Sequence, residues 1–218
     1  MQAVVDWDDT LFPTTALMRA AASAGVELQK YHPSLGELRE LREISHHAIA
    51  LMAHLHHHCQ VAIMTNSSPG WCMLTARLFM PSLAKFIETR NIIIVSAPEV
   101  YYLEQGLTML DFPSEISSKL GLAWKAAALR QLLALNETKE LPDLLSIGDG
   151  EAEEWASYTM LSEGRVREVR LVKLSQKATY GRLSRELKAT LDFSITAVIP
   201  NSGHCEIDLG AFRKDTTF

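Results

Sequence analysis

Short apolar runs rich in β-branched residues recur along the chain and predict the strands of one sheet. The runs are continuous and do not alternate between apolar and polar positions, which is typical of strands that are covered on both faces. They occupy residues 3–5, 61–64, 92–95, 144–147, 169–174 and 193–199. The sequence therefore predicts a mainly parallel sheet, and we expect the segment 193–209 to add a strand at its edge.

Helical patterns lie between these runs. Apolar residues spaced by three or four predict helices over the ranges 14–24, 35–58, 71–87 (interrupted at Pro81), 122–135, 151–161 and 179–191. The alternation of strands and helices predicts a doubly wound, Rossmann-like three-layer α/β/α sandwich with right-handed crossovers. Residues 98–121 are expected to form a loop that follows the third strand.

Length and composition fit an ordinary globular protein. The 218 residues suit a single domain over 1–218. The formal net charge of −5 argues against nucleic acid or an anionic membrane as a partner, and no apolar run is long enough to span a bilayer. Three scattered cysteines do not make a disulfide framework, and no signal peptide is visible, so we expect a cytoplasmic protein.

Polar residues follow four of the predicted strands, at 6–10, 65–68, 96–98 and 148–150. In parallel α/β sheets, ligands bind outside the carboxyl ends of the strands. Each segment taken alone also reads as a turn or a helix cap. The four segments together, two of which bear carboxylates, predict a binding or catalytic site at this edge of the sheet.

The densest of these segments carries Asp6 and Asp8, two positions apart. In an extended backbone such side chains share a side. Two carboxylates there can hold a hard cation such as Mg²⁺. Alternatively, one can attack a phosphorus centre while the other transfers a proton. A surface turn carrying acids is the third interpretation.

Three further positions add to this set, and each has a simpler interpretation. Asp149 lies between two glycines and can join a metal site, with Glu153 or Glu154 as a further ligand, although acids also favour a helix start. The hydroxyl of Thr65 can hold a phosphate oxygen or cap a helix. The ammonium of Lys125 can reach a bound phosphate, or it can lie in solvent. Lys119 is the alternative lysine for contacting the phosphate.

In chain order, these pieces resemble the four motifs of the haloacid dehalogenase superfamily: Asp6-x-Asp8-x-Thr10, Thr65, Lys125, and Gly148-Asp149 with an acid at 153. The resemblance spans residue 3 to about residue 155. It implies Asp6 as the nucleophile that forms an aspartyl-phosphate and Asp8 as the general acid/base. Thr65, Asn66 and Lys125 would bind the phosphoryl group. Asp6, the Asp8 carbonyl, Asp149 and Glu153 would hold Mg²⁺.

The second aspartate points to a phosphatase and not a dehalogenase. Asp9 stands where many members of the superfamily have Gly, and Glu153 stands where they often have Asp. The stretch 13–60 leaves room for a helical crossover with at most a small cap insertion. We therefore expect a Mg²⁺-dependent phosphohydrolase that acts on a phosphorylated small molecule or protein.

Other interpretations remain open. A binding or regulatory module of the same fold, with little turnover, is the main alternative; a phospho-acceptor receiver domain fits the motif order less well. A histidine-rich stretch at 46–58 places His54 and His58 at i, i+4 spacing, a metal-ligand spacing. We interpret that stretch as a polar helix face.

Overall fold

A computed structural model describes residues 1–106, 118–135, 140–200 and 202–211 of the chain. Its strands form one parallel sheet in the order β3-β2-β1-β4-β5-β6. They are β1 (Gln2–Val5), β2 (Gln60–Thr65), β3 (Ile93–Ser96), β4 (Asp143–Gly148), β5 (Glu168–Lys173) and β6 (Cys205–Asp208). The first strand lies inside the sheet, so the residues that follow it open onto a site flanked by β2 and β4.

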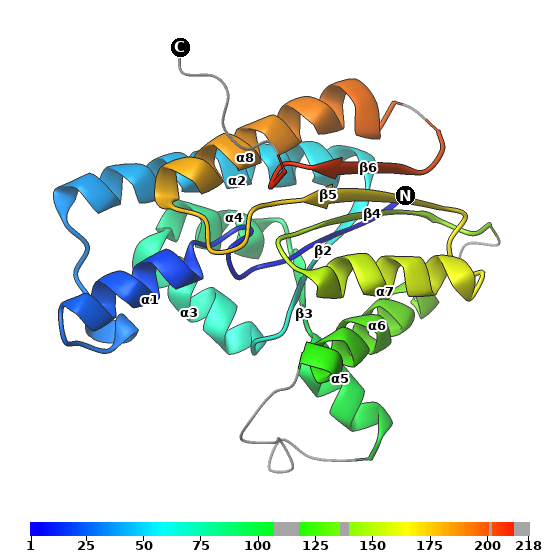
Figure 1. Cartoon of the computed structure of the whole chain (residues 1–218), viewed down its shortest axis with the longest axis horizontal. Coiled ribbons are helices and arrows are strands. Elements are labelled where there is room, and N and C mark those ends of the chain that lie inside the picture. The colour runs from blue at the N-terminus through cyan, green and yellow to red at the C-terminus, as the bar shows by residue number, and fades with distance from the viewer. Residues whose placement is uncertain (107–117, 136–139, 201, 212–218) are drawn as a thin grey trace.

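Helices cover both faces of this sheet, as Figure 1 shows. The described helices are α1 (Thr14–Ser23), α2 (Leu35–His58), α3 (Pro69–Phe79), α4 (Pro81–Thr89), α5 (Ala97–Glu104), α6 (Ser118–Ala134), α7 (Glu151–Ser162) and α8 (Tyr180–Phe193), with the short 3₁₀ turn η1 (Leu28–Lys30). The α/β class and the three-layer, Rossmann-like architecture predicted from the sequence are confirmed.

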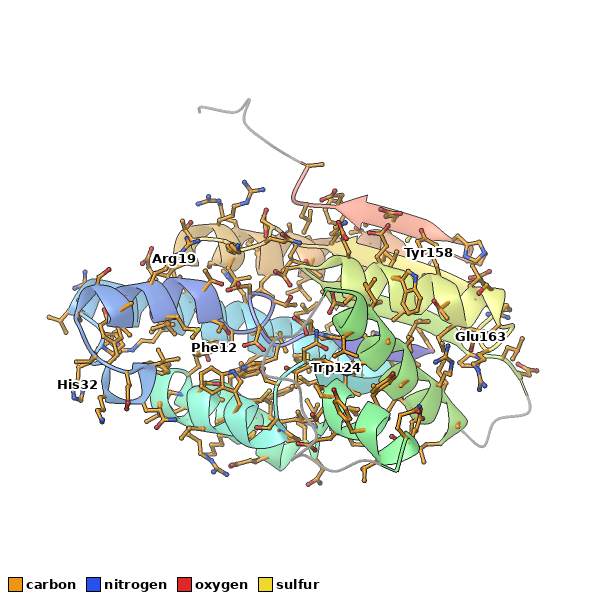
Figure 2. All side chains as sticks on the ribbon, turned by 60° about the horizontal axis from the view of Figure 1, so that its bottom comes forward. Phe12, Arg19, His32, Trp124, Tyr158 and Glu163 are labelled. Atoms are coloured by element: carbon orange, nitrogen blue, oxygen red, sulfur yellow. The ribbon has the colours of Figure 1, made fainter. Side chains whose placement is uncertain are left out.

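The two faces bury separate apolar clusters. One face packs α2, α3, α4 and α8 against the sheet, and the fully buried Phe12 belongs to it. The other face packs α5, α6 and α7, and the fully buried Trp124 belongs to it. Figure 2 shows Phe12 and Trp124 in the interior and Arg19 and Glu163 toward the outside. The central strands are thus covered on both sides, which explains their continuous apolar runs.

The long helix α2 has the bounds that the apolar spacing predicts. It begins at a capping box, in which the hydroxyl of Ser34 accepts the backbone N–H of Glu37 and the Glu37 carboxylate accepts the N–H of Ser34. The strand β2 follows α2 and starts at Gln60. The stretch between β1 and α2 holds the helix α1 and the turn η1, which agrees with the helix predicted over 14–24.

Three details of the sequence prediction are wrong. Residues 194–198 form a π-helical turn that continues α8, and the edge strand is β6, later in the segment 193–209. Residues 97–104 are helical in α5, because Ser96 caps a helix start. The rest of the expected loop, at 107–117, lies outside the described residues.

The third error concerns the hand of the crossovers. From β4 to β5 the chain crosses the face that carries α7, whereas from β5 to β6 it crosses the opposite face, where α8 packs on α2. All strands are parallel and both steps move in the same direction across the sheet, so the two crossovers have opposite hands. Uniformly right-handed crossovers, the usual rule, therefore do not occur here.

Among the described residues, no helix is long and apolar enough to cross a membrane.

Candidate active site

A cleft of about 560 Å³ opens at the carboxyl ends of β1 and β4. Its lining comes from five places: the segment after β1, the segment after β2, the start of α6, the turn from β4 into α7, and the segment after β5. The lining residues are Asp6, Asp8, Asp9, Asn66, Gly121, Leu122, Asp149, Gly150, Glu151, Ala152, Glu153 and Gln176. Most of the residues singled out in the sequence thus meet in one cleft.

Lys125 is buried beside this cleft and contacts two of its carboxylates. Its ammonium lies 2.5 Å from Oδ1 of Asp6 and 2.6 Å from Oε1 of Glu153, and it also donates to the Met64 carbonyl at 2.8 Å. The Lys125 side chain is 1% exposed. A buried ammonium with three acceptors is fully satisfied, so this lysine links the ends of β1, β2 and α7. The side chain of Lys119 lies outside the described part of the structure.

In this cluster, the attraction between Lys125 and the carboxylates opposes the effect of burial on their pKa values. Burial would lower the pKa of Lys125, but the carboxylates of Asp6 and Glu153 raise it above its ordinary value. Burial would raise the pKa of Glu153, but Lys125 lowers it. The pKa of Asp6 is raised by burial, and Glu153, Asp149 and Asp8 add to the rise that Lys125 opposes. One ammonium does not balance these acids.

Asp149, on the opposite wall, feels the same excess of negative charge. Burial, followed by the charges of Glu153 and Asp9, raises the pKa of Asp149 to about 7. Oε2 of Glu153 is buried and makes no hydrogen bond of good geometry among the described residues, and the backbone N–H groups of Glu153 and Gly150 help to lower the pKa of this carboxyl group. An unpaired buried carboxylate oxygen is costly unless something positive meets it. The cleft therefore has the electrostatics of a cation site.

Gly148 and Gly150 make room for the Glu153 side chain. A Cβ at position 148 would lie 2.5 Å from Cγ and 2.8 Å from Cδ of Glu153, and one at position 150 would lie 3.0 Å from Oε2. The carboxylate thus lies across the backbone turn between β4 and α7 on its way to Lys125. This close approach explains why glycines flank Asp149.

We expect Gly148→Ala to displace Glu153 and weaken its ion pair with Lys125. The loss in unfolding free energy should be about 1–3 kcal/mol, the range for overpacking a tight site, measured by urea unfolding. Gly36→Ala in α2 is the matched control, because a Cβ there meets nothing closer than 3.9 Å. Equal stability of the two variants would contradict the packing argument.

The Asp8 carboxylate is held by four donors. Thr14 donates at 2.5 Å and the Trp71 indole at 3.2 Å to Oδ1, while the hydroxyls of Thr65 and Ser67 donate at 3.3 and 3.1 Å to Oδ2. Asp8 is half-buried and lines the cleft. No other described carboxylate of the cleft has so many hydrogen-bond partners.

Asp9 has a structural part in this loop. Its φ of 55° lies in the left-handed region, which favours glycine and tolerates Asp. Its carboxylate accepts the backbone N–H of Thr15 at 2.8 Å and also the Thr15 hydroxyl. The residue before α1 is Pro13, which makes no side-chain cap. Asp9 therefore caps α1 from the preceding turn.

No protein-family model, curated protein or solved structure matches this chain. The likeness to the haloacid dehalogenase superfamily thus rests on the residues of this chain, and every function drawn from it is a proposal.

The cleft suits some metals better than others. Among the described residues, no three His, Cys, Asp or Glu side chains form a group that could hold a metal ion by themselves. Mg²⁺ uses one or two protein carboxylates and keeps several waters, so it needs no such group. The described lining offers oxygen donors and neither His nor Cys. The residues therefore fit Mg²⁺ and do not fit Zn²⁺.

The predicted phosphate-binding residues take different positions. Asn66 is exposed on the cleft wall. Thr65 is fully buried; its hydroxyl donates to Asp8 and accepts the backbone N–H of Ser67 at 2.9 Å. Lys125 contacts Asp6 and not open space. Thr65 and Lys125 thus lie behind the acids, whereas Asn66 lies beside them.

Thr14, Ser67 and Trp71 were missed as functional residues by the sequence reasoning. The run 65–68 signals Ser67, because it follows a strand of the site. Nothing in the sequence marks Trp71 as anything other than an apolar position of α3, or Thr14 as anything other than a helix start. Their role follows only from the fold, which brings both onto Asp8.

The histidine-rich stretch lies away from the cleft, at the end of α2. The rings of His54 and His58 are 4.8 Å apart. His57 and His58 border a second hollow of about 480 Å³, which Met1 and Gln60 also line at the amino end of the sheet. None of the predicted site residues lines that hollow. The candidate active site is therefore the cleft at the carboxyl ends of the strands.

Proposed function

We propose that the protein is a Mg²⁺-dependent phosphohydrolase of the haloacid dehalogenase type, which cleaves a phosphate monoester through an aspartyl-phosphate on Asp6. The observation that carries the proposal is the buried Lys125, which bridges Asp6 and Glu153 beneath a cleft that also presents Asp8 and Asp149. This arrangement supplies a nucleophile, an acid/base and positive charge within one small space.

Asp6 is the nucleophile. Its Oδ1 contacts Lys125, whereas from the described residues its Oδ2 accepts one long hydrogen bond, 3.5 Å from the Thr10 hydroxyl, so Oδ2 is the freer oxygen. That oxygen forms the new bond to phosphorus while the bond from phosphorus to the leaving oxygen breaks. Burial raises the pKa of Asp6, and a cation in the cleft favours the ionised form that attacks.

Asp8 moves the proton in both halves of the reaction. In the first half it gives a proton to the leaving oxygen, which departs as an alcohol. In the second half it takes a proton from water, whose oxygen attacks phosphorus and releases Asp6 as a carboxylate. After the first half Asp6 carries the phosphoryl group and Asp8 has lost its proton; the second half reverses both changes, so the two halves together return the residues to their starting states.

Mg²⁺ would be held by Asp6, Asp149 and the main-chain carbonyl of Asp8, with Glu153 next to them. When bound, it supplies positive charge that stabilises the phosphoryl oxygens in the transition state. Lys125 holds Asp6 in place and adds a fixed charge from the protein side. Asn66 lies on the wall where it can donate its amide N–H to a phosphoryl oxygen.

The test is turnover of a phosphate monoester with and without Mg²⁺. We expect hydrolysis that EDTA abolishes and Mg²⁺ restores. Because the pKa of Asp149 is raised to about 7, Mg²⁺ must displace a proton from Asp149 below that pH. The affinity of the protein for Mg²⁺ should therefore rise up to about pH 7 and then level off. Borohydride added during turnover should reduce an acyl phosphate at Asp6 to homoserine, which peptide mass spectrometry detects. Hydrolysis that continues in EDTA and gives no homoserine in place of Asp6 would refute the proposal.

A second candidate, a binding or regulatory module with little turnover, is favoured by one observation. All four hydrogen bonds to Asp8 are already made within the protein. A carboxylate so engaged is well suited to hold a rigid loop. A partner retained equally by the protein and its Asp6→Asn variant, together with no hydrolysis of any ester, would favour this second function.

A further inference from the structure

The four donors around Asp8 differ in kind. Oδ1 faces the Thr14 hydroxyl and the Trp71 indole N–H. Oδ2 faces the hydroxyls of Thr65 and Ser67. A hydroxyl can donate or accept, whereas an indole N–H can only donate. The Trp71 indole is therefore the one donor of the four that cannot reverse its hydrogen bond to the Asp8 carboxyl group.

We propose that Trp71 is a positioning residue that fixes the Asp8 carboxyl group for its part as acid/base. The inference rests on the proposed function. In the first half of the reaction, the Asp8 carboxyl group gives its proton to the leaving oxygen as the bond from that oxygen to phosphorus breaks. In the second half, it takes a proton from the attacking water. The indole N–H donates to Oδ1 in both halves and keeps the carboxyl group in one orientation.

Trp71 is itself held rigidly enough for this task. It lies in the first turn of α3, where its backbone N–H donates to the Ser68 hydroxyl at 3.1 Å and its carbonyl accepts the Thr75 hydroxyl at 2.8 Å. The side chain is half-buried and packs against the core of that face. An indole fixed at its backbone and its ring holds a carboxylate with little freedom left to lose.

Thr14 approaches the same Oδ1 from the start of α1. Oδ1 is therefore held from α1 on one side and from α3 on the other. The adjacent Asp9 ties α1 to the same turn through Thr15. The small insertion between β1 and α2 thus contributes a donor to the acid/base, a role for this segment other than covering the cleft.

The contact is tested first without turnover. The chain has four tryptophans, so ¹⁵N-labelled protein gives four indole N–H resonances, and Trp71→Phe identifies the one from Trp71. Asp8→Asn should move that resonance upfield, because a neutral amide oxygen is a weaker acceptor than a carboxylate. The resonance of the exposed Trp155 should not move. A Trp71 resonance that Asp8→Asn leaves in place would overturn the inference.

The catalytic consequence is tested with two esters. An alkyl phosphate has a poor leaving group that needs the proton from Asp8, whereas p-nitrophenyl phosphate needs little help. Trp71→Phe should lower kcat/KM about 10-fold or more for the alkyl ester and less than about 3-fold for the aryl ester. Thr14→Val, which removes only a hydroxyl, should act in the same direction. Trp155→Phe is the control and should change neither value.

The outcomes separate the two proposals. Equal losses on both esters would show that Trp71 only supports the fold, which overturns the inference and leaves the function standing. No hydrolysis of either ester by the wild type would refute the proposed function and, with it, the positioning role of Trp71. A shifted indole resonance in that case would still establish the Trp71–Asp8 contact.

Discussion

Asp6→Asn is expected to lower kcat by at least about 10³-fold, the scale on which an enzyme loses its nucleophile. The amide has the shape of the carboxyl group but cannot form the acyl phosphate, so homoserine should also disappear from the borohydride experiment. The measurement is initial-rate hydrolysis of p-nitrophenyl phosphate at saturating Mg²⁺. Turnover by Asp6→Asn within 10-fold of the wild type would contradict the assignment.

This variant is expected to stay folded. Burial and the neighbouring acids raise the pKa of Asp6, so removing its charge relieves repulsion while Lys125 keeps Glu153 as a partner. The matched control is Asp192→Asn on α8, which makes the same chemical change far from the cleft. We expect full activity from that control. Unfolding of Asp6→Asn would be seen by circular dichroism and would separate loss of structure from loss of chemistry.

The central fold could be predicted because its signals are local and strong. The runs at 3–5, 61–64 and 144–147 are apolar on both faces, since helices cover both sides of the sheet. Their carboxyl ends converge in any parallel sheet, so the meeting of Asp6, Asp8 and Asp149 follows from topology alone. The structure brings the Lys125 ammonium onto Asp6, whereas the choice of Lys125 over Lys119 as the phosphate-binding lysine stays a prediction.

The sequence failed where tertiary contacts outweigh local preference. Residues 193–199 are β-branched enough to read as a strand, but Ser194 and Val198 are buried against the core and the chain continues helically from α8. The donors of Asp8 also come from separate elements, α1 and α3, and no spacing rule links Thr14 to Trp71. The positive φ of Asp9 shows only in the folded backbone.

The second large effect is expected from Lys125→Met, which keeps the length of the side chain and removes its charge. Asp6 and Glu153, each 8% exposed, would be left without their counter-ion. Leaving buried charges unpaired costs about 3–5 kcal/mol of unfolding free energy, measured by urea unfolding at pH 8. Hydrolysis should fall with it, because Asp6 loses the group that holds Oδ1.

The pH dependence and a matched variant distinguish this mechanism from a simple packing defect. Without Lys125, burial keeps the folded-state pKa values of Asp6 and Glu153 above their unfolded values. Groups shifted upward stabilise the fold at low pH and lose that contribution as pH rises, so the deficit should be smaller at pH 5 than at pH 8. Lys173→Met breaks the more exposed pair with Glu154, 2.9 Å long, and should cost less than about 1 kcal/mol at either pH. If Lys125→Met lowers the unfolding free energy equally at both pH values, the unpaired carboxylates are not the cause. The ion pairs of Lys125 with Asp6 and Glu153 would then not be what stabilises the site.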